Sequence, residues 1–285
     1  AYAMTVDASG NVYTTGSFTG TADFDPGAGV FNLIAAGYDV FVSKLDASGN
    51  FVWAKSMSGS AAEIAYAIAV DVSGNVYTGG IFNGAPDFDP GAGVATLTAV
   101  GGNDAFVVKL DASGNFVWAN QFGGAGPEGV VFSLALDGLG NLYSFGEFSG
   151  VMDFDPGAAV FNIQSKGSVD IFLVKLDLSG NLVWAKQLGG IQWDRGSHVT
   201  VDALGFIYVT GEVYGIADFD PGVGVFNIGA FGGGNIFLSK LDAAGNLVWA
   251  KSMGNAYINN HGLSIAVNPL GSIYSTGTFA GTIDF

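Results

Sequence analysis

The sequence predicts an all-β protein built from repeated, four-stranded antiparallel units, and three observations carry this prediction. First, a V-W-A string containing Trp53, Trp118, Trp184 or Trp249 recurs at intervals of 65, 66 and 65 residues. Second, apolar runs of strand length alternate with D-x-x-G-N turns, and no segment shows sustained i, i+3, i+4 spacing. Third, 46 of the 285 residues are glycine although 49% are apolar, which argues against disorder and collagen.

The second unit shows how each repeat is organised. Strands are expected over residues 66–70, 75–82, 105–110 and 116–121. Turns 71–75 and 111–115 join them in pairs, because their Asp side chain can accept backbone N–H groups and their Gly can take a positive φ. Turns of this kind contain eight of the 25 acids and are expected to be structural. Four short strands per repeat, apolar on both faces, are typical of a β-propeller blade that stacks between neighbours.

The repeated pattern D-[VAI]-F-[VL]-x-K-L-D-x-x-G-N-[FL]-V-W-A-K, followed by A-I-A-V-D-x-x-G-N-[VL]-Y-x-x-G, resembles the bacterial SBBP-type β-propeller repeats, and more loosely the NHL repeats. The resemblance covers nearly the whole chain and implies a β-propeller with antiparallel blades of about 65 residues. Four full blades and a partial fifth with two strands are expected, over residues 1–59, 60–123, 124–190, 191–254 and 255–285. Members of the family commonly close as seven-bladed rings, so this chain is expected to be a fragment of a larger propeller.

Charge and composition restrict the partners. There are 25 acidic and 9 basic residues, and the formal net charge of −16 disfavours nucleic acid and anionic membrane surfaces. An acidic excess favours cations instead. No run of 18 apolar residues is present, so membrane insertion is not expected. The chain has no cysteine, and therefore no disulfide framework is predicted.

A D-F-D-P-G string between the second and third strands of each repeat is the first candidate site. Carboxylates spaced i, i+2 point the same way in extended backbone, while the intervening Phe points into the protein. Calcium prefers roughly six to eight oxygen ligands, which carboxylates and turn carbonyls supply. With the acid that begins the third strand, this predicts calcium ligands at Asp23, Asp25, Asp39, Asp87, Asp89, Asp104, Asp153, Asp155, Asp170, Asp218 and Asp220. In the alternative interpretation each Asp caps its own turn and the Phe is a plug.

The loops between repeats offer weaker candidates. Glu147 and Glu212 stand at equivalent places near the end of the second strand, where paired carboxylates could perform glycoside chemistry across a cleft. The alternative is two exposed acids on neighbouring blades. Trp193 and Arg195 combine an aromatic ring with a fork-shaped donor, which suits a sugar or carboxylate ligand, but sequence drift in one repeat is the favoured explanation. Three further polar residues share one loop position and suggest a structural or calcium-linked role: Glu63, Glu128 and Asn260.

These features favour a non-enzymatic, calcium-stabilised β-propeller segment of a large bacterial extracellular or cell-surface protein, acting as a scaffold or as an adhesion or interaction module. Its expected partners are other surface proteins or glycans, and the rest of the same polypeptide. No catalytic residue is predicted, and Ca²⁺ is the one expected cofactor. The alternative is a glycan-binding or glycan-cleaving propeller that uses the face of irregular loops. A third possibility is a purely architectural spacer.

Overall fold

The computed structural model describes residues 1–59, 61–126, 129–254 and 260–283. Within these ranges the chain forms β-strands and no helix. The same ranges contain no helix long and apolar enough to cross a membrane. The chain divides into two compact units, residues 1–125 with 129–131 and residues 126–128 with 132–285. The predicted all-β class is therefore confirmed.

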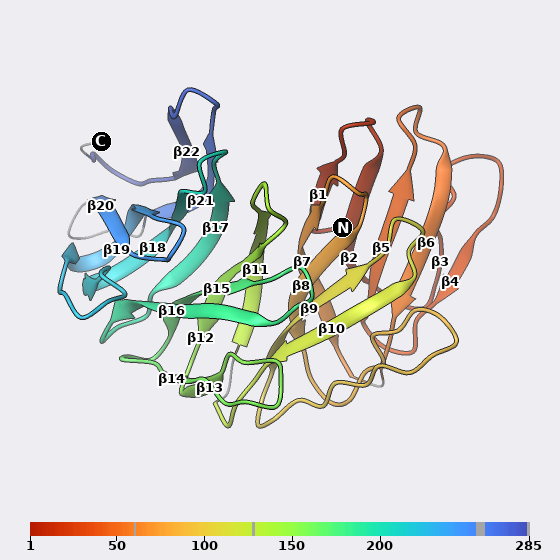
Figure 1. Cartoon of the computed structure of the whole chain (residues 1–285), viewed down its shortest axis with the longest axis horizontal. Coiled ribbons are helices and arrows are strands. Elements are labelled where there is room, and N and C mark those ends of the chain that lie inside the picture. The colour runs from red at the N-terminus through yellow and green to blue at the C-terminus, as the bar shows by residue number, and fades with distance from the viewer. Residues whose placement is uncertain (60, 127–128, 255–259, 284–285) are drawn as a thin grey trace. The chain divides into compact units, whose positions relative to one another are not determined.

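The first unit contains two four-stranded antiparallel sheets, in the orders β1-β2-β5-β6 and β7-β8-β9-β10 (Figure 1). Their strands are β1 (Ala3–Val6), β2 (Val12–Phe18), β5 (Asp39–Leu45), β6 (Phe51–Met57), β7 (Glu63–Val70), β8 (Val76–Phe82), β9 (Asp104–Leu110) and β10 (Phe116–Phe122). The four strands expected in the second repeat are confirmed, with some ends shifted by a few residues. A short hairpin of β3 (Thr21–Asp23) and β4 (Asn32–Ile34) carries the first D-F-D-P-G string.

The second unit repeats this order of strands, but its third and fourth repeats are hydrogen-bonded into one sheet. Its strands are β11 (Gly129–Leu136), whose first three residues belong to the first unit, β12 (Leu142–Phe148), β13 (Val151–Asp153), β14 (Asn162–Gln164), β15 (Asp170–Leu176), β16 (Leu182–Gly190), β17 (Arg195–Val201), β18 (Ile207–Asp218), β19 (Asn227–Leu241), β20 (Leu247–Met253), β21 (His261–Val267) and β22 (Ile273–Thr278). The end of β16 pairs with the end of β18, through Gly189 with Asp218 and Gly190 with Ala217. This joining was not expected from the sequence, which suggested separate sheets.

The D-x-x-G-N turns have the predicted construction, as the turn after β11 illustrates. Oδ1 of Asp137 accepts the backbone N–H groups of Leu139 and Asn141, both at 2.9 Å. Oδ2 accepts the Asn141 amide at 2.8 Å and the Tyr143 hydroxyl at 3.1 Å. Gly140 closes the turn at a φ of 83°, which residues with a side chain rarely adopt. The turn therefore fixes its own shape and also satisfies a fully buried tyrosine.

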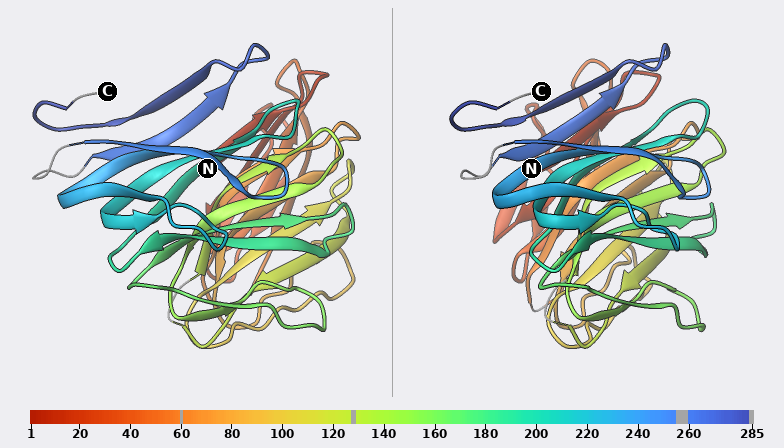
Figure 2. Two further views of the ribbon diagram at one scale, coloured as in Figure 1. Left: turned by 60° about the vertical axis from the view of Figure 1, so that its left-hand side comes forward. Right: turned by 90° about the vertical axis from the view of Figure 1, so that its left-hand side faces the viewer.

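Stacking of one repeat on the next builds the core of each unit. In the first unit β7 packs against β1, β2 and β5, and in the second unit β17 packs against β12 and β15. The β21–β22 hairpin, dark blue in Figure 2, lies along β17 and β18. The Trp53 indole N–H donates to the Ala112 carbonyl of the following repeat at 3.2 Å. Strands such as β9 and β12 are buried along their whole length, as apolar residues on both faces predicted.

Candidate functional site

The D-F-D-P-G strings form capped turns, as the third repeat shows. Oδ1 of Asp153 accepts the backbone N–H groups of Asp155 at 3.0 Å and Phe161 at 2.7 Å, and Oδ1 of Asp155 accepts that of Gly157 at 2.8 Å. The other three repeats have the same bonds, made by Asp23 and Asp25, Asp87 and Asp89, and Asp218 and Asp220. These are the contacts of the turn-capping alternative.

The phenylalanine of each string points inward, as predicted. Phe154 has no exposed surface, and its ring centroid lies 5.3 Å from that of Phe148 and 5.2 Å from that of Phe172. Phe88 and Phe219 are equally buried. We call the segment between the second and third strands of each repeat, which carries the D-F-D-P-G string, the excursion. Its phenylalanine anchors it on the core.

The acids predicted to share a calcium ion do not gather as sets of three. Among the residues that the structure describes, no group of three or more histidine or acidic side chains is placed to hold a metal ion. Asp39, Asp104 and Asp170, which begin β5, β9 and β15, are buried in networks separate from the capped turns. Calcium binding stays a prediction. The buried acids at the starts of the third strands are better candidate ligands than the capped turns.

Each acid at the start of a third strand is held by groups from its own loop. Oδ2 of Asp170 accepts the Lys166 backbone N–H at 2.7 Å and the side-chain amide of Gln187. Oδ2 of Asp104 accepts the Val100 N–H at 2.9 Å. Oδ1 of both aspartates is buried from solvent and has no hydrogen-bond partner among the described residues. Burial raises the pKa of both carboxyls, against the opposing effect of these hydrogen bonds.

A second buried acid, from the loop between repeats, adjoins the first. The Glu63 N–H donates to the carbonyl of Tyr38, the residue before Asp39, at 2.8 Å, and the Asp194 N–H donates to Val169, the residue before Asp170, at 3.0 Å. Both acids are fully buried. Burial, reinforced by repulsion from Asp39, raises the pKa of Glu63 to about 7.

Asp194 behaves in the same way in the second unit. Burial, with repulsion from Asp170, raises the pKa of Asp194 to about 7, although the backbone N–H groups of Gly190 and Tyr214 oppose the shift. The structure therefore pairs Asp39 with Glu63 and Asp170 with Asp194. Glu128, the corresponding acid of the loop between the second and third repeats, lies outside the described residues.

The two glutamates singled out from the sequence lie in one charged cluster with Arg195 and His261. Arg195 Nε is 3.5 Å from Glu147 Oε2, and Arg195 is the strand partner of Glu212. His261 Nδ1 lies 2.6 Å from Glu212 Oε1, and the Tyr214 hydroxyl donates to Oε2 at 3.3 Å. Both glutamates are over nine-tenths buried, so the expectation of two exposed acids is wrong. We call these five residues the Arg195 cluster.

Trp193 is half exposed and stacks on Tyr214, with ring centroids 6.4 Å apart and an interplanar angle of 14°. The part that His261 plays in the Arg195 cluster was not predicted from the sequence. The one available signal was its place at the start of the first strand of the fifth repeat, one repeat after Arg195 at the start of the fourth. Glu147 forms an ion pair with Arg195, and Glu212 contacts His261, so each glutamate already faces a basic side chain.

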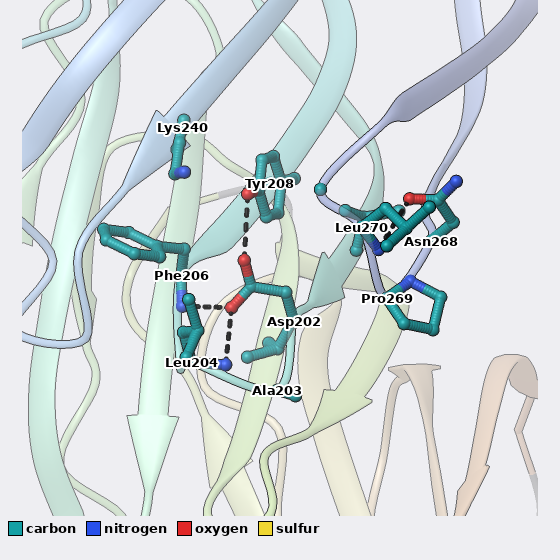
Figure 3. A pocket seen from close by; sticks show the side chains of 12 residues that line it. Asp202, Ala203, Leu204, Phe206, Tyr208, Lys240, Asn268, Pro269 and Leu270 are labelled. Carbon is teal, nitrogen blue, oxygen red and sulfur yellow. Dashed lines mark hydrogen bonds between the residues drawn. The ribbon is translucent and has the colours of Figure 1, made fainter.

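A cavity of about 350 Å³ lies elsewhere, between the turns at 202–206 and 268–271 (Figure 3). Asp202 accepts hydrogen bonds from the Leu204 and Phe206 backbone N–H groups and from the Tyr208 hydroxyl, all at 2.9 Å. The Lys240 ammonium lies 3.8 Å from the centre of the Phe206 ring. The carboxylate of Asp202 is thus engaged in shaping its own turn.

Comparison with known proteins agrees with the repeats and turns. Residues 183–218, from β16 to β18, match the family model of the SBBP β-propeller repeat. An uncharacterised WD repeat-containing protein of Acanthamoeba polyphaga mimivirus is 26% identical over 198 residues, which cover 61% of this chain and 14% of that protein. The regulatory protein FlaEY of Caulobacter vibrioides is 28% identical over 150 residues, which cover 51% of this chain and 15% of that protein.

A solved structure of a protein of unknown function from Bacteroides caccae aligns with 84% of this chain and 93% of that chain, at 11% identity and a TM-score of 0.23. This score is too low to support a statement about fold. The strands, the turns and the family match are together consistent with a protein class built from β-propeller repeats. The repeat at residues 183–218 is of the SBBP type.

Proposed function

We propose that the chain is a non-enzymatic interaction or scaffold segment of a large bacterial extracellular or cell-surface protein. The observation that carries this proposal is an exposed Val–Phe pair on the excursions of three repeats. Val160 is 70% exposed and Phe161 44%, and the pairs Val30–Phe31 and Val225–Phe226 are similarly exposed. Large exposed apolar patches mark surfaces that bind other macromolecules, and each Val–Phe pair is proposed to contribute to such a surface.

The four full repeats and the partial fifth are proposed to be part of a larger ring. The matched segments span only 14% and 15% of the two relatives, which supports the occurrence of such repeats within much longer proteins. Other surface proteins, glycans and the rest of the same polypeptide are the proposed partners. Calcium is the proposed stabilising ion, because two pairs of buried carboxylates lack enough hydrogen-bond donors to balance their charge.

Replacing Val160 and Phe161 together by serine tests the interaction surface. Because both side chains are exposed, the melting temperature should stay within about 2 °C of wild type. Retention of the fluorescently labelled chain on bacterial cells, measured by flow cytometry, should fall several-fold. The matched control is Leu139→Ser, which removes an 81% exposed apolar side chain from a turn. Equal retention of wild type and the Val160/Phe161 variant would count against the interaction surface.

The glycan-cleaving alternative is tested with Glu147→Gln. We expect no turnover on a panel of polysaccharides by either wild type or the variant, because Arg195 already pairs with this carboxylate and a glycosidase needs one carboxyl group free to act as an acid. The assay measures released reducing ends, with a glycan array run in parallel. Turnover by wild type that disappears in Glu147→Gln would establish the alternative and refute the non-enzymatic proposal.

A further inference from the structure

The buried acids Asp170 and Asp194 face one common point in the second unit. A Cβ atom placed on Gly189 would lie 3.0 Å from Asp170 Oδ1 and 3.0 Å from Asp194 Oδ2, so the two oxygens are at most twice that distance apart. Gly189 has a φ of 142°. A side chain at this position would therefore press against both carboxylates, which are shut off from solvent.

Part of this pair has no hydrogen-bond partner among the residues that the structure describes. Both aspartates have no exposed surface, and within that part of the chain Asp170 Oδ1, the oxygen nearest the Gly189 position that Asp194 also adjoins, accepts no hydrogen bond. In the first unit Glu63 is equally buried, and no described residue is a hydrogen-bond partner of either of its carboxylate oxygens. A buried, unpaired carboxylate is strongly unfavourable unless a positive charge or a proton compensates it.

The fourth repeat shows what replaces the pair when it is absent. The two acids are separated by 24 residues in both described pairs, from Asp39 to Glu63 and from Asp170 to Asp194. The same backbone contact recurs one repeat later, where the Asn260 N–H donates to the carbonyl of Gly234, the residue before Asn235, at 2.9 Å. Both residues of this pair, which lie 25 positions apart, are amides. The Asn260 side-chain amide donates to the Gly234 carbonyl at 3.2 Å. The two positions lose their charge together, as expected if the carboxylates act on one shared charge.

We propose that each buried pair, Asp39 with Glu63 and Asp170 with Asp194, binds one divalent cation of the calcium class. The donors are hard carboxylate oxygens, and neither pair includes a histidine, which favours Ca²⁺ over Zn²⁺ or Cu²⁺. This inference rests on the calcium stabilisation proposed above and assigns it to the buried pairs. The capped Asp-Phe-Asp turns are not the proposed sites, because the Oδ1 atoms of their aspartates already accept backbone N–H groups.

The test is titration of the intact chain with Ca²⁺ by calorimetry, and with Tb³⁺ by tryptophan-sensitised luminescence. Trp193 directly precedes Asp194 and provides the sensitiser. The variant Asp170→Asn/Asp194→Asn copies the neutral pair of the fourth repeat. It should lose one equivalent of bound Ca²⁺ and most of the luminescence. The control Asp153→Asn/Asp155→Asn neutralises a capped turn of the same unit and should bind as wild type does.

Three results would overturn the assignment. Unchanged binding by the Asp170/Asp194 variant would exclude this pair. Loss of binding only in the Asp153/Asp155 control would show that calcium binds at the capped turns. The assignment to the buried pair would then be wrong, whereas the proposal that calcium stabilises the chain would stand. No Ca²⁺ binding by wild type, with a carboxyl resonance that titrates near neutral pH, would show that the pair shares a proton, and both proposals would fail. Should the Asp170/Asp194 variant not fold, Asp39→Asn/Glu63→Gln makes the same test in the first unit.

Discussion

Replacing Phe154 by alanine should destabilise the chain by about 3–5 kcal/mol, the usual cost of removing a fully buried aromatic side chain. Phe154 has no exposed surface and packs edge-on against Phe148 while it contacts Phe172. Its loss would leave a cavity where the excursion meets the core. Chemical unfolding in urea, monitored by tryptophan fluorescence, measures the change in the free energy of unfolding.

The matched control is Phe161→Ala in the same excursion. Phe161 is 44% exposed, and it holds Asp153 through its backbone N–H, which alanine retains. We expect a loss below about 1 kcal/mol. Similar losses for the two variants would contradict the conclusion that the D-F-D-P-G phenylalanine anchors the excursion on the core.

Without calcium, the chain should become more stable as the pH falls from about 8 to about 5. The pKa values of Glu63 and Asp194 are about 7 in the folded chain, because both are buried beside another acid, and about 4 when unfolded. Between these values the folded state holds protons that the unfolded state releases, so acidification favours folding. Thermal unfolding in EDTA across this range measures the effect, and a falling melting temperature would contradict it.

At lower pH the turn acids reverse this trend. Burial opposes the shift, but hydrogen bonds from Asn141, Leu139 and Tyr143 keep the pKa of Asp137 below its ordinary value. A lowered folded-state pKa stabilises the chain above the unfolded value, and this stabilisation is lost as the pH falls toward the folded one. Maximum stability in EDTA is therefore expected in the mildly acidic range.

The D-x-x-G-N turns could be predicted from the sequence because their shape is determined locally. Five residues contain the acceptor, the donors and the glycine that takes a positive φ. The inward direction of Phe154 followed equally from the i, i+2 spacing of its neighbours. The role of Asp153 and Asp155 could not be predicted in this way, because a turn cap and a calcium ligand require the same residue in the same place.

The long-range pairings could not be predicted, because they join segments that share no local pattern. The Arg195 cluster draws on four strands from β12 to β21, and its ion pairs depend on how successive repeats stack. The pairing of Asp170 with Asp194 depends on contact between two loops, through the bridge of Val169 with Trp193. The constant spacing of 24 residues was the signal available for it.

The melting temperature at about pH 8, in EDTA and in millimolar Ca²⁺, tests the role of the buried carboxylate pairs most directly. This pH lies above the pKa of about 7 that burial gives Glu63 and Asp194, so a bound cation would remove the repulsion between each of them and the neighbouring acid. We predict a melting temperature several degrees higher in Ca²⁺ than in EDTA, and a much smaller difference in the Asp170→Asn/Asp194→Asn variant. Superimposable melting curves of the wild-type chain in EDTA and in Ca²⁺ would contradict a cation-binding role for these pairs.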